Sequence, residues 1–146
     1  MLQESFETGS LTMLPVLLVT VLTPPEDAEY LLKIVTGLTP LVMGRYDSNA
    51  FQGAGGIEFY RPLEGAAAGP ETAVRARPGM VELTFELPED PRLLSRVVET
   101  IFQHHAYQEP NIRVAPILSS RSKGLDDKAN PRRWWNRGGD WAKVQS

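Results

Sequence analysis

Two neighbouring histidines and a nearby carboxylate are residue types that bind metal ions. His104, His105 and Glu109 lie within six residues of one another, and imidazole and carboxylate groups are common ligands of divalent cations. Adjacent residues of a helix point about 100° apart, so two such imidazoles seldom share one ion. At a helix C-terminus the histidines would instead favour the helix dipole, and His105 would hydrogen-bond the following turn. Both interpretations remain open, with a divalent-metal site as the alternative to a structural role.

Arg61 is the strongest single candidate for binding an anion. It follows an aromatic segment and precedes Pro62, whose fixed φ holds the adjoining backbone. A guanidinium group can bind a phosphate or a carboxylate through two parallel hydrogen bonds. An ion pair with a neighbouring acidic residue is the competing interpretation. Arg75 and Arg77, further along the chain, are weaker candidates for the same chemistry.

A glycine-rich segment, residues 53–56, has the composition of a loop that binds phosphate through backbone N–H groups. No Gly-Lys-Ser or Gly-Lys-Thr follows it, and no helix is expected directly after it, which excludes the common nucleotide-binding fingerprints. A hairpin turn in which glycine supplies a positive φ explains the segment better.

The sequence contains no recognisable catalytic arrangement. It has no cysteine, which excludes disulfides, thiolate metal sites and a cysteine nucleophile. It also lacks a Ser-His-Asp arrangement with a nucleophile turn and a His-Glu-x-x-His motif. We therefore expect a protein that is not an enzyme and holds no cofactor.

Composition predicts an ordinary globular protein of about one domain. The 146 residues are 42% hydrophobic and 23% charged. The longest apolar run, residues 11–22, is too short to span a bilayer. The segment before it contains Glu4 and Glu7 but no basic residue, so we expect no secretory signal. These features predict a cytoplasmic protein that does not bind a membrane.

Strands and two amphipathic helices alternate along the chain. Apolar residues at helical spacing predict one helix that begins at Pro24, with Thr23 as its N-cap, and a second that begins at Pro91. Apolar or alternating segments predict strands over residues 15–23, 41–46, 57–63, 81–87 and 112–118. The second and third of these strands read as a hairpin, followed by a loop over residues 64–79. This order predicts an α+β, ferredoxin-like split βαβ sandwich, an antiparallel sheet with two helices on one face.

The chain divides into parts of different composition. Residues 1–120 contain 8 basic and 15 acidic side chains, a net charge of −7, whereas residues 121–146 contain 7 basic and 3 acidic ones, a net charge of +4. All three tryptophans lie in the second stretch. We predict an N-terminal arm over residues 1–14, a ferredoxin-like domain over 15–120 and a basic, Trp-rich C-terminal tail over 121–146.

The Trp-rich tail has three interpretations. Arginines interleaved with tryptophans can stack on nucleic-acid bases, but the acidic body argues against nucleic acid as a partner. Disorder would leave three indole rings in water. We favour docking, in which Trp134 and Trp135 fill an apolar groove. Arg132 and Arg133 would then contact the acidic body of the same or a neighbouring subunit.

Three motifs in order give the body a resemblance to a known family. They are GRYDSNAF at 44–51, GGIEFYRPLEG at 55–65 and HAYQEP at 105–110. Over residues 15–118 the chain resembles the inserted domain of the NGG-one-interacting-factor-three family, whose fold is similar to CutA and the PII signalling proteins. Asn49, Ala106 and Gln108 stand where that family typically has Cys, Pro and Glu.

The resemblance implies a CutA/PII-like trimer whose ligands bind in clefts between subunits. The expected function is that of a non-enzymatic module that self-associates and binds a small anionic ligand or a partner protein. The residues expected at the ligand are Arg61, Tyr46, Gly55, Gly56, Tyr107 and Glu109. A divalent-metal protein of CutA type, using His104, His105 and Glu109, is the alternative. The dinuclear metal site of the full-length family belongs to a surrounding domain that this sequence does not include, so it is not carried over.

Overall fold

The computed structural model describes residues 4–124 and 129–142 of the chain. The helices are α1 Pro25–Thr36, α2 Pro91–His104 and the short 3-10 helix η1 Trp134–Asn136. The strands are β1 Phe6–Glu7, β2 Leu11–Thr23, β3 Phe51–Gln52, β4 Gly56–Tyr60, β5 Arg75–Leu87 and β6 Ile112–Ser122. None of the helices in these ranges is long and apolar enough to cross a membrane.

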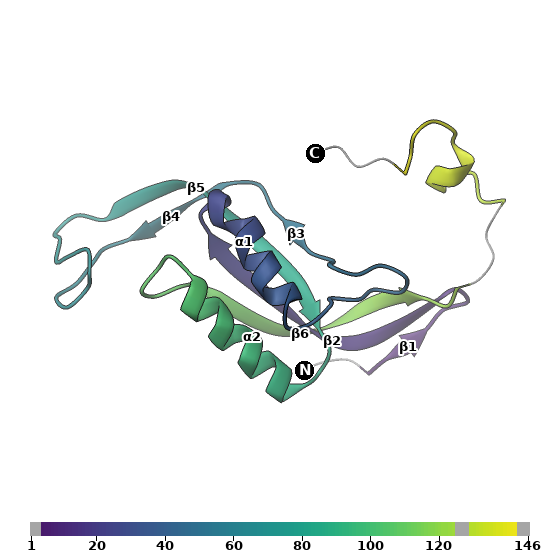
Figure 1. Ribbon diagram of the computed structural model, residues 1–146, viewed down its shortest axis with the longest axis horizontal. Coiled ribbons are helices and arrows are strands. Elements are labelled where there is room, and N and C mark those ends of the chain that lie inside the picture. Colours follow the sequence, from purple (N-terminus) through teal and green to yellow (C-terminus); the bar gives the residue numbers. More distant parts are fainter. Residues whose placement is uncertain (1–3, 125–128, 143–146) are drawn as a thin grey trace.

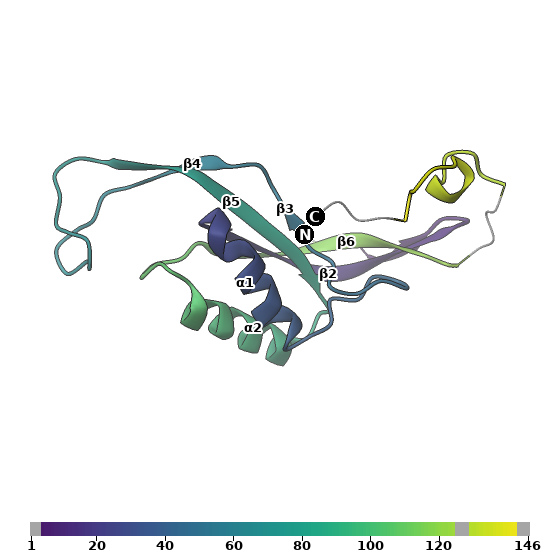
Figure 2. The same cartoon turned by 45° about the horizontal axis from the view of Figure 1, so that its top comes forward.

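An antiparallel sheet organises the body (Figure 1). β2 lies between β6 and β5, both β3 and β4 pair with β5, and β1 forms a hairpin with the start of β2. Both helices cover the same face of this sheet (Figure 2). The two β-α-β units therefore interleave as in a ferredoxin-like split βαβ sandwich, which confirms the predicted α+β fold class.

The apolar faces of the helices and of the sheet meet in one core. Side chains alternate along a strand, and the residues that β2 and β5 turn toward the helices are buried with residues of α1 and α2. The buried cluster consists of Val19, Val21, Leu31, Val35, Leu41, Leu83, Phe85, Leu87, Val97 and Ile101. Burial of each large side chain contributes about 1.5–3 kcal/mol before conformational entropy is counted. This core fixes the sheet from which the candidate site projects.

Helix α1 starts one residue later than the sequence predicts. Its N-cap is Pro24, and Thr23 Oγ1 donates a hydrogen bond to the Pro24 carbonyl at 3.1 Å instead of capping the helix. Thr23 is the last residue of β2 and is fully buried. Because the sheet holds Thr23 extended, its hydroxyl does not reach the first helical N–H groups. Asp90, by contrast, caps α2 with its side chain.

The strand predicted over residues 41–46 is a loop instead. Leu41 is buried with a φ of 54°, and Gly44 has a φ of 60°, so the backbone turns twice within this segment. A single bridge joins Met43 to Tyr46. The predicted hairpin is therefore wrong, and the partner of β4 is β5. The physical reason is that only Leu41 of this segment packs in the core. A strand here would need alternate side chains to be buried as well.

A two-stranded arm projects from the body (Figures 1 and 2). β4 and the first part of β5 form it, so the predicted loop over residues 64–79 includes strand residues from Arg75 onward. We call residues 56–80 the hairpin arm. Ile57 and Phe59 share one of its faces, and both are exposed, with Phe59 69% exposed. The arm thus has an apolar face that the body does not cover.

The sheet face opposite the helices, here called the open face, has an apolar centre with charged groups beside it. Leu14, Val16 and Leu18 of β2 alternate with the residues that face the helices, so they point to the open face. The strand register places Ile117 beside Val16 and Glu86 beside Leu18 on the same face. β2 begins at Leu11 and β6 ends at Ser122, so the sheet includes residues that the composition assigned to the N-terminal arm and the tail.

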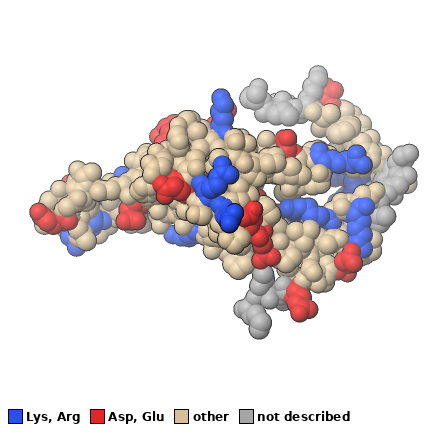
Figure 3. Space-filling view, turned by 60° about the horizontal axis from the view of Figure 1, so that its bottom comes forward, with Lys and Arg blue, Asp and Glu red and all other residues tan. Residues whose placement is uncertain are grey.

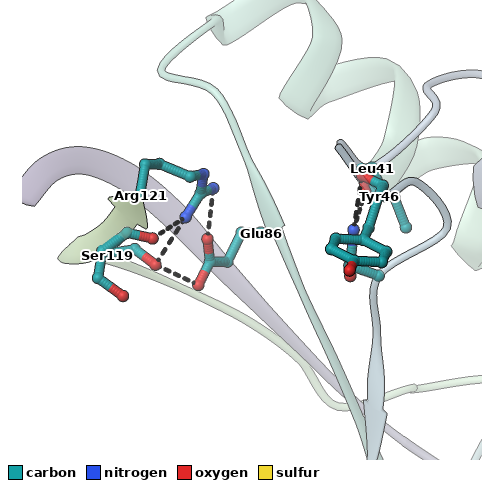
Figure 4. Close-up of polar contacts among 7 residues, drawn as sticks. Leu41, Tyr46, Glu86, Ser119 and Arg121 are labelled. Atoms are coloured by element: carbon teal, nitrogen blue, oxygen red, sulfur yellow. Dashed lines mark hydrogen bonds and ion pairs between the residues drawn. The ribbon is translucent and has the colours of Figure 1, made fainter. Parts of the chain in front are cut away.

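An ion pair crosses the open face near the end of β6 (Figure 4). Arg121 Nη2 is 2.8 Å from Glu86 Oε1, and each side chain is 19% exposed. Ser119 Oγ donates to Glu86 Oε2 at 2.7 Å and accepts from Arg121 Nη1 at 3.1 Å. The two charges are therefore compensated within a closed hydrogen-bonded ring, which joins β5 to β6 across β2.

Candidate ligand site at the base of the hairpin arm

A guanidinium group held between two tyrosine rings is the centre of the candidate site. The Cζ atom of Arg77 is 4.7 Å from the centre of the Tyr60 ring and 4.5 Å from the centre of the Tyr107 ring. Arg77 Nη2 also donates to Tyr60 Oη at 2.9 Å. Cation–π contacts are worth about 0.5–2 kcal/mol each, so these side chains hold one another in place. We call Glu58, Tyr60, Arg75, Arg77 and Tyr107 the Arg77 cluster.

The register of the hairpin arm brings four members of the Arg77 cluster to one face. Glu58 pairs with Arg77, and Tyr60 pairs with Arg75. Directly opposed residues of an antiparallel pair share a face. The carboxylate of Glu58 and the phenol of Tyr60, both on β4, therefore lie on the same face as the two guanidinium groups of β5. Tyr107 comes from the loop between α2 and β6 and completes the cluster from the body.

Tyr107 attaches the hairpin arm to the body. Its Oη donates to Glu58 Oε1 at 2.9 Å and lies 2.8 Å from Met80 Sδ. Its ring packs edge-on against the His105 ring, with the ring centres 4.7 Å apart. Asn111 Nδ2 adds a longer contact of 3.4 Å to Glu58 Oε2. The orientation of the arm relative to the sheet therefore depends on the loop between α2 and β6.

The polar contacts continue outward along the hairpin arm through Glu71. Its carboxylate forms an ion pair with Arg75, and its backbone carbonyl accepts from Arg61 Nη1 at 3.1 Å. Gln108 Oε1 accepts from the Ala67 N–H at 2.9 Å, which ties the outer loop to the segment after α2. Three guanidinium groups are thus linked along the arm, and two carboxylates compensate them only in part.

The Arg77 cluster shifts the pKa values of its two tyrosines in opposite directions. A hydrogen bond to Arg75 lowers the pKa of Tyr60; partial burial opposes this shift and Arg77 adds to it. Burial raises the pKa of Tyr107, and the hydrogen bond to Arg77 offsets part of that increase. Hydrogen bonds to Glu71 and to Tyr107 raise the pKa values of Arg75 and Arg77, respectively. Both guanidinium groups therefore remain charged.

Two glycines allow the strands to approach at the base of the hairpin arm. A Cβ atom on Gly55 would lie 3.3 Å from Gly79 Cα, and Gly79 itself has a φ of 79°. The register shifts between Gly56 and Ile57, next to this contact. The predicted ligand residues Gly55 and Gly56 therefore lie beside the Arg77 cluster, where they shape the backbone.

The two histidines contact other parts of the protein. His105 Nδ1 accepts from the Tyr107 N–H at 3.0 Å, which leaves Nε2–H to donate to the Leu22 carbonyl at 2.7 Å. His104 Nδ1 is 2.6 Å from the hydroxyl of Tyr30. Within residues 4–124 and 129–142, no three His, Asp or Glu side chains form a group that could hold a metal ion. The structure therefore offers no support for the alternative metal site at His104, His105 and Glu109.

The structure brings together only part of the predicted ligand set. Tyr107 lies in the Arg77 cluster, and Arg61 reaches its outer end through Glu71. Glu109 is exposed in the loop after α2. Tyr46 is exposed beside Leu41, in the loop at the end of the sheet opposite the hairpin arm (Figures 1 and 4). A ligand bound at the Arg77 cluster would not reach Tyr46.

The ligand residues predicted from the sequence include neither Tyr60 nor Glu58, and Arg77 is a weaker candidate there than Arg61. The available signal was alternation, since Glu58 and Tyr60 are two residues apart, as are Arg75 and Arg77. Because the sequence predicts a loop over residues 64–79, it gives no reason to pair Arg75 and Arg77 with β4. The register of β4 against β5 is what places the four side chains together.

Within residues 129–142, the tail tryptophans do not insert into the body of the same chain. Trp134 is 63% exposed, and Trp135 and Trp141 are about half exposed. The Trp135 and Trp141 rings contact each other, with their centres 6.2 Å apart. The predicted groove for Trp134 and Trp135 is therefore not filled within one chain, and contact with a neighbouring subunit stays a prediction for these tryptophans and for Arg132 and Arg133.

Comparisons with known proteins identify structural relatives only. No family model and no curated protein matches the sequence. A Bacillus cereus protein related to NIF3 aligns with a TM-score of 0.60 and 20% identity over 82% of this chain and 30% of its own. The divalent ion tolerance protein CutA1 from Ehrlichia chaffeensis aligns with a TM-score of 0.50 and 16% identity, over 77% of this chain and 86% of its own. A PII-like protein from Thiomonas intermedia has a TM-score of 0.44 and 12% identity, over 76% and 98%.

These similarities concern the fold. The chain spans 30% of the length of the NIF3-related protein, so the activity of that whole protein does not follow from the alignment. The first two alignments confirm the similarity of fold that the three sequence motifs predicted, to a NIF3-related protein and to CutA. A shared fold of this kind does not define a ligand, because function depends on the residues of the site.

Proposed function

We propose that this chain is a non-enzymatic, self-associating module of CutA/PII-like fold that binds a small anionic ligand at the Arg77 cluster. The observation that supports this most directly is the Arg77 guanidinium held between the rings of Tyr60 and Tyr107. A guanidinium group has five N–H donors in one plane, and the hydrogen bonds to Tyr60 and Tyr107 use some of them. The remaining donors suit the edge of a phosphate or a carboxylate.

Self-association would supply the other wall of the site. The Arg77 cluster lies on a projecting arm, and the opposite face of that arm exposes the apolar side chains of Ile57 and Phe59. Exposed apolar patches of this kind are typical of interaction surfaces. We propose a trimer, as the resemblance to CutA and PII proteins implies, with the ligand in the cleft between subunits. A partner protein in the same cleft is the alternative occupant, and a cytoplasmic location is part of this proposal.

Titration with inorganic phosphate and with succinate, followed by calorimetry, tests the ligand site. Arg77→Gln should weaken binding about tenfold or more, because a bidentate charged contact is lost. Arg96→Gln is the matched control, since it removes the same charge from an exposed position on α2 and should leave binding unchanged. Equal affinities of wild type and Arg77→Gln, or no binding of either probe by the wild type, would overturn the assignment.

A native mass spectrum of the purified protein tests the assembly separately. A trimer is the expected result, and a monomer at every concentration would contradict self-association. Extra mass on each subunit would show the class of a co-purified ligand. If a monomer binds phosphate, the anion site is supported and the cleft between subunits is contradicted. The anion site and the self-association are therefore tested independently.

A further inference from the structure

A hollow of about 310 Å³ opens at the end of the sheet opposite the hairpin arm. Buried apolar side chains, including those of Val16, Leu41 and Leu87, line it, and the carboxylates of Glu86 and Glu89 belong to the same lining. This volume lies at the lower limit of ligand pockets in proteins. It suits one or two large side chains rather than an extended cofactor.

The tail exposes a large apolar side chain, Trp134, on a turn that hydrogen bonds hold in one conformation. Asn130 Oδ1 accepts from the Arg132 N–H at 2.9 Å, and the Asn130 carbonyl accepts from Asn136 Nδ2 at 2.7 Å. These bonds close the turn that leads into η1. Trp135 packs on Trp141, whereas Trp134 points outward and is 63% exposed. The tail therefore presents one indole ring on a locally ordered turn.

The charges of the hollow and of the tail are complementary. Glu86, Glu89 and Arg121 all belong to the lining of the hollow, and Arg121 pairs with Glu86, so the lining has a net charge of −1. Arg132 and Arg137 flank the tail tryptophans. At this end of the molecule, Figure 3 shows Lys and Arg side chains with Asp and Glu side chains beside them. The same contrast holds for the whole sequence. Residues 1–120 contain 8 basic and 15 acidic side chains, a net charge of −7, and residues 121–146 contain 7 basic and 3 acidic ones, a net charge of +4. The two parts therefore attract each other electrostatically.

From these observations we propose that Trp134 of one copy docks in the hollow of a second copy of this chain. The two complementary surfaces do not meet within one chain, because Trp134 is exposed while the hollow is open. A surface that fits a different surface of an identical molecule joins copies head to tail, and such contacts form a ring when the rotation between copies closes. This inference rests on the self-association proposed above and adds to it the contact that would join neighbouring copies.

Tryptophan fluorescence reports this contact directly. All three tryptophans of the protein lie in the tail, so the emission spectrum contains no signal from the body. Docking in a second copy should move the emission to shorter wavelength as the protein concentration rises, together with the oligomer seen by native mass spectrometry. Emission that is already blue-shifted and independent of dilution would indicate docking within one chain and overturn the proposal.

Two full-length variants separate the tail from the hollow. Val42→Lys places a positive charge in the wall of the hollow, at a side chain that is 54% exposed, so the fold should tolerate it. It should weaken tail docking about tenfold or more. The lysine side chain would take up space that Trp134 needs in the hollow, and its charge would repel the arginines of the tail. Ser95→Lys adds the same charge at an exposed position of α2, away from the hollow; it is the matched control and should behave as wild type.

Mixing provides the decisive result. A double variant, Trp134→Ala with Trp135→Ala, retains the hollow but has lost the anchor, whereas Val42→Lys retains the anchor but has a blocked hollow. Neither alone should show the concentration-dependent shift, and mixing them should restore it. If mixing restores nothing while the wild type shifts, the hollow does not receive the tail. If the wild type assembles by mass without any shift, self-association stands and tail docking is wrong. A wild type that remains monomeric overturns both.

Discussion

The hairpin arm and the helix-backed body are stabilised by different interactions. In the body, apolar side chains from β2, β5, α1 and α2 are buried together. In the arm, two strands have no helix over them, and the apolar face with Phe59 remains exposed. The contacts that orient the arm are hydrogen bonds and ring contacts around Arg77 and Tyr107. An isolated two-stranded hairpin is marginal in water, so the same polar contacts that form the candidate site also hold the arm in place.

Substitutions of large apolar side chains should show the strongest contrast between body and arm. Ile101→Ala removes a fully buried side chain and should lower the free energy of unfolding by about 2–5 kcal/mol. Phe59→Ala removes a larger but exposed side chain and should change it by about 0.5 kcal/mol or less. Urea unfolding of the dilute protein measures both. Equal losses would contradict the division into a packed body and an uncovered arm.

The next largest effect concerns the ion pair on the open face. Arg121→Gln leaves the carboxylate of Glu86 without its charged partner at a site where both side chains are 19% exposed. We expect a loss of about 1–3 kcal/mol in unfolding free energy. Lys123→Gln is the control, because its partner Glu7 is mostly exposed and such surface pairs contribute about 0–1 kcal/mol. The ranking fails if the two variants lose the same stability.

A smaller effect should be confined to the hairpin arm. Tyr107→Phe keeps the ring against Arg77 but removes the hydroxyl that contacts Glu58 and Met80. Amide hydrogen exchange of β4 and of the start of β5 should become up to about tenfold faster, as the loss of one hydrogen bond implies. Exchange in β2 should be unchanged. Faster exchange throughout the sheet would mean that the arm and the body unfold as one unit.

The smallest predicted effect is the order in which the two tyrosines ionise. Tyr60 should ionise below the usual pKa of about 10 and Tyr107 above it. The contribution of Tyr60 to stability is thus present above its unfolded pKa and lost as the pH falls through its folded pKa. The contribution of Tyr107 is present below its unfolded pKa and lost as the pH rises through its folded pKa.

NMR titration of ring-labelled tyrosine measures both values, and Tyr60→Phe and Tyr107→Phe assign the signals. Arg75→Gln should raise the pKa of Tyr60, because Arg75 is the main cause of its shift. The same variant should leave Tyr107 unchanged. An identical pKa for Tyr60 in wild type and Arg75→Gln would show that Arg75 does not act on this hydroxyl.

Much of the fold could be predicted from local patterns. The strict alternation of Val81–Leu87 identifies β5, and the apolar stripes identify both helices. Prediction failed at residues 41–46, where an apolar run suggested a strand. Only Leu41 of that run is needed in the core, and periodicity does not show how many members of an apolar run the core will take.

Prediction of the candidate site was less complete, for a different reason. The HAYQEP and RPLEG segments directed attention to Tyr107 and Arg61, but Tyr46 lies at the other end of the sheet. Tyr60 and Arg77 belong to paired strands, β4 and β5, which are separated along the chain by the outer loop of the arm. A register between distant strands is set by the bulge at Gly79 and by the length of the arm, neither of which is a local property of either strand.

Local periodicity and composition were enough to predict both helices, most of the strands, the ferredoxin-like class and the division into an acidic body and a basic tail. Three features became known from the folded structure alone: Arg77 lies between Tyr60 and Tyr107, His105 contacts Leu22 and the loop before β6, and the hollow near Leu87 is open while Trp134 is exposed. Those facts depend on register and packing between segments far apart in the chain, which no local pattern encodes.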